Sequence, residues 1–175
     1  NVIIVGGGTA GWMCAAALSK LIGNRLNITL VESEQIGTIG VGEATVPTFL
    51  TLHRLLKIDE ADFLSKVQGT IKLGISFENW RQIGHQYIHS FGFTGQGCWA
   101  AGFQHFWLKG KQLGLSEDYG DYTPELKAAK ENKFGFLKEA PLHYAYHIDA
   151  GRYATFLRQL AEREGVTRIE GGVQE

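Results

Sequence analysis

The sequence predicts an α/β protein built on a parallel sheet, and its opening 32 residues carry that prediction. An apolar run over residues 1–5 is typical of a buried strand, and the run NITLVE over residues 27–32 is typical of a second. Between them, residues 12–21 have the apolar spacing of a helix. Two parallel strands joined by a helix form a right-handed crossover, so this order predicts a sheet covered by helices.

Length, charge and composition limit the class of protein. The chain has 175 residues, with 17 basic against 18 acidic side chains and a formal net charge of −1. This balance gives no electrostatic reason to expect nucleic acid or an anionic membrane as a partner. No apolar run reaches the roughly 18 residues of a membrane span. Two cysteines, Cys14 and Cys98, are too few for a disulfide framework, so a cytoplasmic protein is expected.

The rest of the chain alternates between apolar runs and glycine-rich or polar segments. In chain order we expect a loop over 33–47, helices over 48–56 and 60–66, strands over 70–80 and 87–91, a helix over 103–114, a surface excursion over 119–140, a helix over 151–165 and a strand over 166–173. His53 is expected on the exposed side of the helix over 48–56.

A glycine fingerprint lies between the first strand and the first helix. Gly6, Gly8 and Gly11 form G-x-G-x-x-G, which allows a tight turn, a close approach of the backbone to a pyrophosphate, and close packing of helix on strand. Glu32 ends the second strand, where a carboxylate accepts hydrogen bonds from a ribose. The pattern predicts a Rossmann-like site for FAD or NAD. Its predicted binding residues are Gly6, Gly8, Thr9, Ala10, Gly11 and Glu32.

Several further motifs resemble one known family. They are GGGTAGW over 6–12, GVGEATVP over 40–47, IKLGISFENW over 71–80, YIHSFG over 87–92, FQHFWL over 103–108 and YHIDAGRYATFL over 146–157. In this order and along the whole chain, they resemble the flavin-dependent tryptophan halogenases. The resemblance favours FAD over NAD.

The resemblance also implies a domain organisation. It implies the FAD-binding fold of the single-component flavin monooxygenases, with residues 1–175 forming the FAD-binding module and part of the substrate region inserted at about 48–145. We expect the chain to be a piece of a longer one that stops before the substrate cap is complete. The family's W-x-W-x-I-P stretch and its partner glutamate are absent from these residues and are expected beyond residue 175.

The activity implied by the resemblance is halogenation of a small aromatic molecule. In the family, a separate flavin reductase supplies FADH2, which reacts with oxygen and a halide, chloride or bromide, to give hypohalous acid. A lysine delivers the halogen to an electron-rich ring such as tryptophan, indole or a related compound. The loop between residues 80 and 89 is shorter than in tryptophan-specific members of the family. The resemblance therefore does not decide which of these aromatic compounds is the substrate. The sequence does not decide the oligomeric state either, and a homodimer is compatible with it.

The resemblance assigns three residues to catalysis and substrate binding. Lys72 matches the family lysine, although on its own a lysine in a strand usually faces solvent. A buried amine would have a lowered pKa and would be able to orient hypohalous acid or form a haloamine. His89 and Phe91 match the residues that sandwich the indole. Alternation along a strand places their side chains on one face, as stacking requires, although core packing would place them equally well.

A glycine-rich strap and one strand residue complete the predicted site. By the resemblance, Gly42, Glu43 and Ala44 pass beside the flavin and link it to the substrate site. Val173 matches a position whose backbone holds the adenine.

Two other functions remain compatible with the residues themselves. A single-component aromatic hydroxylase would share the glycine fingerprint and Glu32, but it needs neither Lys72 nor the strap. A non-catalytic dinucleotide-binding module would need only the fingerprint. Dependence of the product on halide separates the first from a halogenase, and the absence of any product identifies the second.

Overall fold

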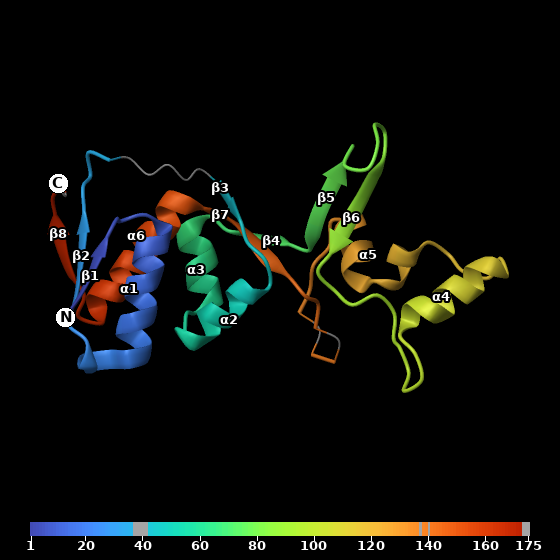
Figure 1. Ribbon diagram of the computed structural model, residues 1–175, viewed down its shortest axis with the longest axis horizontal. Helices are drawn as coiled ribbons and strands as arrows, with labels where there is room; N and C mark the ends of the chain where they lie inside the picture. Colours follow the sequence, from blue (N-terminus) through green and yellow to red (C-terminus); the bar gives the residue numbers. More distant parts are fainter. Residues whose placement is uncertain (37–41, 137, 140, 173–175) are drawn as a thin grey trace. The chain divides into compact units, whose positions relative to one another are not determined.

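The computed structural model describes residues 1–36, 42–136, 138–139 and 141–172 (Figure 1). The chain forms two compact units. The first contains Asn1–Thr70 and Tyr146–Glu175, and the second contains Ile71–Ala145. The chain leaves the first unit within β4 (Thr70–Lys72) and returns to it within β7 (Ala145–Asp149).

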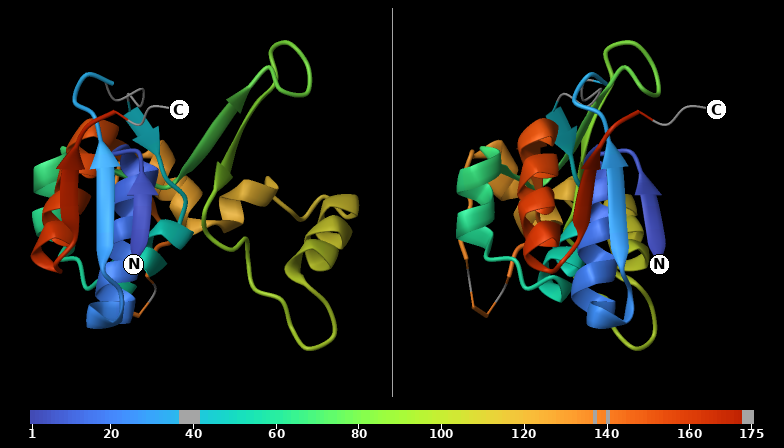
Figure 2. Two further views of the ribbon diagram at one scale, coloured as in Figure 1. Left: turned by 60° about the vertical axis from the view of Figure 1, so that its left-hand side comes forward. Right: turned by 90° about the vertical axis from the view of Figure 1, so that its left-hand side faces the viewer.

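A parallel three-stranded sheet forms the centre of the first unit. Its order is β1 (Val2–Val5), β2 (Ile28–Glu32) and β8 (Thr167–Glu170), and both pairs of neighbours run parallel. The predicted α/β class and parallel sheet are confirmed. Strand β8 joins β2 rather than β1, which leaves β2 in the middle (Figure 2). β8 also ends at Glu170, three residues before the predicted end at 173.

Helices cover one face of this sheet (Figure 2). Helix α1 (Thr9–Ile22) packs along α6 (Ala150–Arg163), and α3 (Glu60–Val67) packs on α6. Buried alanines on both helices let their backbones approach closely: Ala15, Ala16, Ala154 and Ala161. The other face is apolar but exposed within the described residues, with Ile3 71% and Val5 65% exposed. The prediction of a wholly buried first strand was therefore wrong for this face.

The loop expected over 33–47 contains a short strand. β3 (Gly42–Ala44) pairs antiparallel with β7, so that Glu43 lies opposite Ile148. The N–H of Thr45 then donates to the carbonyl oxygen of Tyr146 at 2.9 Å. Local sequence did not reveal β3 because the partner strand lies about a hundred residues away and supplies the hydrogen bonds that define it.

His53, on α2 (Thr48–Leu55), is buried, contrary to the expectation from sequence. It is 5% exposed, lies edge-on to the ring of Phe63, and its Nε2 is hydrogen-bonded to the Tyr153 hydroxyl at 3.0 Å. Burial lowers the pKa of His53 from 6.5 to about 4 and raises the pKa of Tyr153. The imidazole therefore stays neutral in the folded chain at neutral pH.

We predict that this histidine makes the fold sensitive to acid. The unfolded chain binds a proton at His53 near pH 6.5, whereas the folded chain binds it only near pH 4. Protonation of His53 therefore does not reduce the free energy of unfolding above pH 6.5, and it reduces it progressively as the pH falls from 6.5 toward 4. The loss at pH 4 is about 3 kcal/mol. A His53→Gln variant keeps a polar partner for Tyr153 but cannot titrate. Its thermal midpoint, measured from pH 7 to 4 in the full-length protein, should fall less steeply than that of the wild type; equal slopes would contradict the prediction.

The second unit combines a hairpin with short helices. β5 (Gly74–Glu78) and β6 (Gln86–Ser90) pair antiparallel. The strand predicted over 70–80 is instead two strands, β4 and β5, separated at Leu73. A Cβ on Gly74, the first residue of β5, would lie only 2.6 Å from the carbonyl oxygen of His89 on β6. Glycine is therefore required at this position for β5 and β6 to pair.

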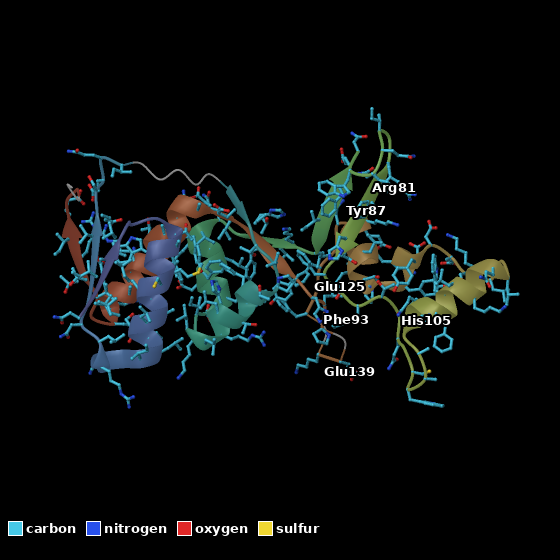
Figure 3. All side chains as sticks on the ribbon, viewed as in Figure 1. Arg81, Tyr87, Phe93, His105, Glu125 and Glu139 are labelled. Carbon is cyan, nitrogen blue, oxygen red and sulfur yellow. The ribbon has the colours of Figure 1, made fainter. Side chains whose placement is uncertain are left out.

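Helices α4 (Phe103–Gln112) and α5 (Pro124–Lys130) follow, with a 3-10 turn at Tyr119–Tyr122. Glu125 of α5 is labelled in Figure 3 and is buried. Its Oε1 accepts a hydrogen bond from the backbone N–H of His143 at 2.7 Å and lies 3.1 Å from Nδ1 of the same histidine. This carboxylate joins α5 to the segment that leads into β7, so the predicted surface excursion over 119–140 contains an anchored helix.

Candidate functional site

An open cavity of about 730 Å³ lies beyond the carboxyl end of β1 and β2 in the first unit. This is the end of a parallel sheet where nucleotides bind in α/β proteins, and the volume is in the range of ligand pockets. The residues that line it include Gly6, Gly7, Gly8, Thr9, Ala10, Trp12, Glu32, Glu34, Glu43, Arg158 and Arg168. The structure thus brings together Gly6, Gly8, Thr9, Ala10, Glu32 and Glu43 of the predicted binding residues.

The three glycines of the fingerprint meet three different requirements. Gly6 has φ +111°, a backbone conformation that other residues rarely adopt. A Cβ on Gly11 would lie 1.9 Å from the carbonyl oxygen of Gly6, so only glycine lets α1 pack on the loop. A Cβ on Gly8 would meet nothing within 4 Å. Packing within the chain therefore does not explain Gly8, and the open space beside it leaves room for a ligand.

The N-terminus of α1 faces the same cavity. The helix begins at Thr9 after Gly8, no side chain caps it, and its first turn carries no acidic residue. Its first-turn N–H groups and partial positive charge are suited to phosphate oxygens. The hydroxyl of Thr9 donates to the carbonyl oxygen of Ala150 at 3.4 Å, which joins this turn to the start of α6. The open backbone at Gly8 and the uncapped helix fit the pyrophosphate of a dinucleotide.

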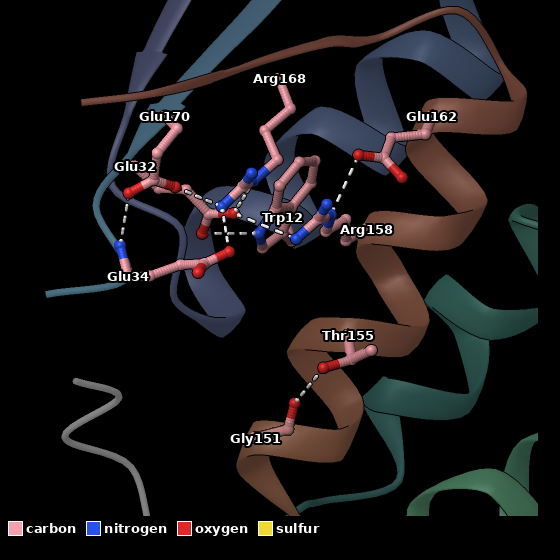
Figure 4. A network of polar contacts seen from close by, with 9 residues as sticks. All are labelled: Trp12, Glu32, Glu34, Gly151, Thr155, Arg158, Glu162, Arg168 and Glu170. Carbon is pink, nitrogen blue, oxygen red and sulfur yellow. Dashed lines mark hydrogen bonds and ion pairs between the residues drawn. The ribbon is translucent and has the colours of Figure 1, made fainter. Parts of the chain in front are cut away.

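Glu32 lies at the side of the cavity and is held by neighbouring side chains (Figure 4). Its Oε2 accepts a hydrogen bond from the indole N–H of Trp12 at 3.2 Å, and its Oε1 accepts one from Nε of Arg168 at 2.5 Å. Nη1 of Arg158 is 3.8 Å from the same Oε1. A Cβ on Gly7 would lie 1.4 Å from Oε2, so the Glu32 carboxylate fills the space that a side chain at position 7 would occupy.

Arg168 also joins two other carboxylates. Its Nη2 is 3.0 Å from Oε1 of Glu34 and 2.5 Å from Oε2 of Glu170. The hydrogen bond to Glu32, together with the charges of the three carboxylates, raises the pKa of Arg168. The guanidinium therefore stays charged and links the ends of β2 and β8.

Sequence reasoning missed four residues of this site: Gly7, Trp12, Arg158 and Arg168. The triple glycine and the tryptophan directly after Gly11 were visible signals for the first two. The two arginines lie more than a hundred residues from the fingerprint, and only the pairing of β8 with β2 and the packing of α6 on α1 bring them to it.

The predicted strap contributes one residue to the cavity. Glu43 lines it from β3, while the exposed Gly42 and Ala44 flank Glu43 outside the lining. Val173 lies outside the described residues. The roles assigned to these residues stay predictions.

Lys72, His89 and Phe91 belong to the second unit. Lys72 is 7% exposed, and its Nζ lies 5.3 Å from the centre of the Phe91 ring. Burial lowers the pKa of Lys72. Phe91 is half-buried, and its N–H donates to the carbonyl oxygen of Leu73 at 2.9 Å. His89 is exposed on β6, opposite Ile75. The structure therefore joins Lys72 with Phe91, and it shows no ring contact between Phe91 and His89.

Two kinds of feature are absent from the described ranges of the chain. No three His, Cys, Asp or Glu side chains there are grouped as a metal ion requires. None of the helices there combines the length and the apolar character needed to cross a membrane.

Known proteins resemble this chain over its whole length. The family model described as tryptophan halogenase matches residues 1–175. The 7-chloro-L-tryptophan 6-halogenase KtzR of Kutzneria sp. (strain 744) is 36% identical over 96% of this chain and 37% of its own length. Among solved structures, Xcc4156, a flavin-dependent halogenase from Xanthomonas campestris, is 59% identical with a TM-score of 0.95, over 99% of this chain and 35% of that one. BrvH, a flavin-dependent halogenase from Brevundimonas sp. BAL3, is 39% identical with a TM-score of 0.86, over 97% and 35%.

The chain spans slightly more than a third of the length of these relatives. The match nevertheless includes both units, with the glycine fingerprint in one and the buried lysine in the other. The chain therefore belongs to the tryptophan halogenase family.

Proposed function

We propose that the full-length protein is a flavin-dependent halogenase, which uses FADH2, oxygen and chloride or bromide to halogenate an electron-rich aromatic ring such as tryptophan, indole or a related compound. A separate flavin reductase supplies the FADH2, and the enzyme acts in the cytoplasm. Membership of the family supports this function. The observation that carries it is the buried amine of Lys72 beside the ring of Phe91.

The first unit holds the cofactor in this proposal. The loop from Gly6 to Ala10 and the N-terminus of α1 bind the pyrophosphate, Glu32 binds the ribose, and Glu43 lies along the flavin. Bound reduced FAD would supply the two electrons that bring oxygen to the peroxide level, and that oxygen would then oxidise the halide to hypohalous acid. Gly8 contributes an open backbone and Gly11 the close packing that fixes the helix behind the loop.

Lys72 directs the hypohalous acid to the substrate. As an ammonium, it donates a hydrogen bond to the hypohalous oxygen, and the ring carbon attacks the halogen as the O–X bond breaks. The oxygen takes the ammonium proton and leaves as water, and the proton lost from the ring carbon restores the ammonium. As a free amine, it forms an N–X bond and releases water, and the ring then takes the halogen from nitrogen. Either way, a ring C–H and HOX become C–X and water. Phe91 and His89 stack on the ring being halogenated.

A halide-dependence assay tests this function. The full-length protein is incubated with a flavin reductase, FAD, NADH, oxygen, sodium bromide and indole or tryptophan, and the products are analysed by mass spectrometry. We expect a monobrominated product with the isotope doublet of bromine, and no such product when bromide is left out. A hydroxylated product formed equally with and without bromide would identify an aromatic hydroxylase instead. No product across a panel of indoles and phenols would favour the dinucleotide-binding module.

A further inference from the structure

The carboxylate of Glu32 is fixed before any cofactor binds. It is 15% exposed at the side chain, and donors approach both of its oxygens: Trp12 at Oε2 and Arg168 at Oε1 (Figure 4). The Gly7 backbone lies against it, since a Cβ at Gly7 would overlap Oε2. These contacts restrict the Glu32 carboxylate to one orientation.

These contacts still leave the carboxylate able to accept more hydrogen bonds. An ionised carboxylate offers about four lone-pair sites. Trp12 and Arg168 take one each, and Arg158 at 3.8 Å approaches Oε1 without reaching hydrogen-bond distance. Because Glu32 lines the cavity, its remaining acceptor sites are available to hydroxyl groups there.

Arg168 differs from Trp12 and Arg158, the other two neighbours of Glu32, because its positive charge is shared among three carboxylates. Three carboxylates, Glu32, Glu34 and Glu170, gather around its guanidinium, so without Arg168 they would repel one another. Trp12 is neutral, and Arg158 makes its shorter contact with Glu162 at 2.9 Å. Arg168 therefore offsets part of the negative charge of these three carboxylates and sets the direction of the Glu32 side chain.

We propose that Arg168 is a positioning residue for the cofactor: it holds the Glu32 side chain so that the carboxylate accepts hydrogen bonds from the hydroxyl groups of the adenosine ribose. The inference rests on the proposed function because it takes the ligand of this cavity to be FAD. It adds a residue from β8, outside the glycine fingerprint, that acts on the adenosine half of the cofactor through Glu32. Its loss should weaken recognition of the ribose hydroxyls and leave the pyrophosphate loop intact.

Binding of adenosine ligands to the full-length protein tests this role without any measurement of turnover. FAD is titrated by fluorescence, and ADP and 2′-deoxy-ADP are titrated by competition against FAD. We expect the wild type to bind ADP about tenfold more tightly than 2′-deoxy-ADP, since the deoxy compound leaves a carboxylate acceptor unused. In Arg168→Met the preference should shrink to less than about twofold, with FAD bound about tenfold more weakly.

A double variant separates positioning from general damage. If Arg168 acts through Glu32, Arg168→Met should cost no further FAD affinity in a Glu32→Gln background. Arg163→Met is the matched control, because Arg163 is an exposed residue of α6 that does not line the cavity. It removes the same charge and should leave both the FAD affinity and the ADP preference within about twofold of the wild type.

The outcomes distinguish this inference from the proposed function. A wild type that binds FAD but does not discriminate between ADP and 2′-deoxy-ADP overturns the inference and leaves the function standing. So does an Arg168→Met variant that keeps the discrimination, or additive losses in the double variant. A wild type that binds no FAD overturns the proposed function and this inference together.

Discussion

Replacing Lys72 with methionine in the full-length protein is expected to lower the rate of ring halogenation by about 100-fold or more, the size of a lost proton-transfer or hydrogen-bonding group. Methionine fills most of the buried volume of the lysine stem, so that the fold is retained. Oxygen consumption by reduced flavin should continue at the wild-type rate, because the first unit carries the predicted cofactor residues and Lys72 belongs to the second. Product formation and oxygen uptake are measured in parallel.

A second lysine provides the control. Lys66 on α3 also has its Nζ near an aromatic ring, 5.7 Å from the centre of Phe156, but its side chain is 47% exposed and pairs with Asp62. Lys66→Met thus removes the same charge and a comparable ring contact from a position on the surface. It should halogenate as fast as the wild type. Unchanged halogenation by Lys72→Met would remove Lys72 from the mechanism.

The pH dependence of halogenation then identifies the form of the amine that acts. Burial lowers the pKa of Lys72, so that it titrates below its ordinary value of about 10.4. If the free amine carries the halogen, the rate should rise with pH through that lowered pKa. If the ammonium donates a hydrogen bond, the rate should fall over the same range. The corresponding limb of the profile should be absent from the residual activity of Lys72→Met.

The fold was predictable from sequence where its signals are local. The first strand, the first helix and the second strand follow one another within 32 residues, and each carries its own apolar pattern. β3 was not predictable because it exists only through its pairing with β7. His53 was misplaced for a related reason: the ring cluster that buries it includes Tyr153, a hundred residues further along the chain.

The site shows the same division between local and distant signals. The fingerprint glycines and Glu32 were found because their spacing is fixed by the strand–turn–helix–strand geometry. Arg168 was not found, because an arginine in a strand near the end of the chain has no distinguishing pattern until β8 pairs beside β2. The resemblance to the family supplied Lys72, whereas its burial against Phe91 came only from the structure.

Gly11→Ala is expected to damage both the fold and cofactor binding. The new Cβ would lie 1.9 Å from the carbonyl oxygen and 3.1 Å from the carbonyl carbon of Gly6, and both are backbone atoms that cannot rotate away. Gly6 itself has φ +111°, so that the loop has little room to yield. Helix α1 must then move off the loop, at a cost of about 1–3 kcal/mol in the free energy of unfolding. Chemical unfolding and FAD titration of the full-length protein measure the two effects, and FAD affinity should fall at least about tenfold because the phosphate-binding N–H groups shift with the helix.

Gly8→Ala separates a ligand effect from a packing effect at the same loop. Its Cβ meets no atom of the protein within 4 Å, and its φ of −73° suits alanine, so the free energy of unfolding should stay within about 0.5 kcal/mol of the wild type. The methyl group would nevertheless extend into the space assigned to the pyrophosphate, so FAD affinity should fall as far as in Gly11→Ala. If Gly8→Ala bound FAD normally, the phosphates would have to lie elsewhere in the cavity, and the role of the α1 N-terminus would be wrong. Loss of FAD affinity without loss of stability at Gly8, together with loss of both at Gly11, is the pattern that a pyrophosphate held by this loop requires.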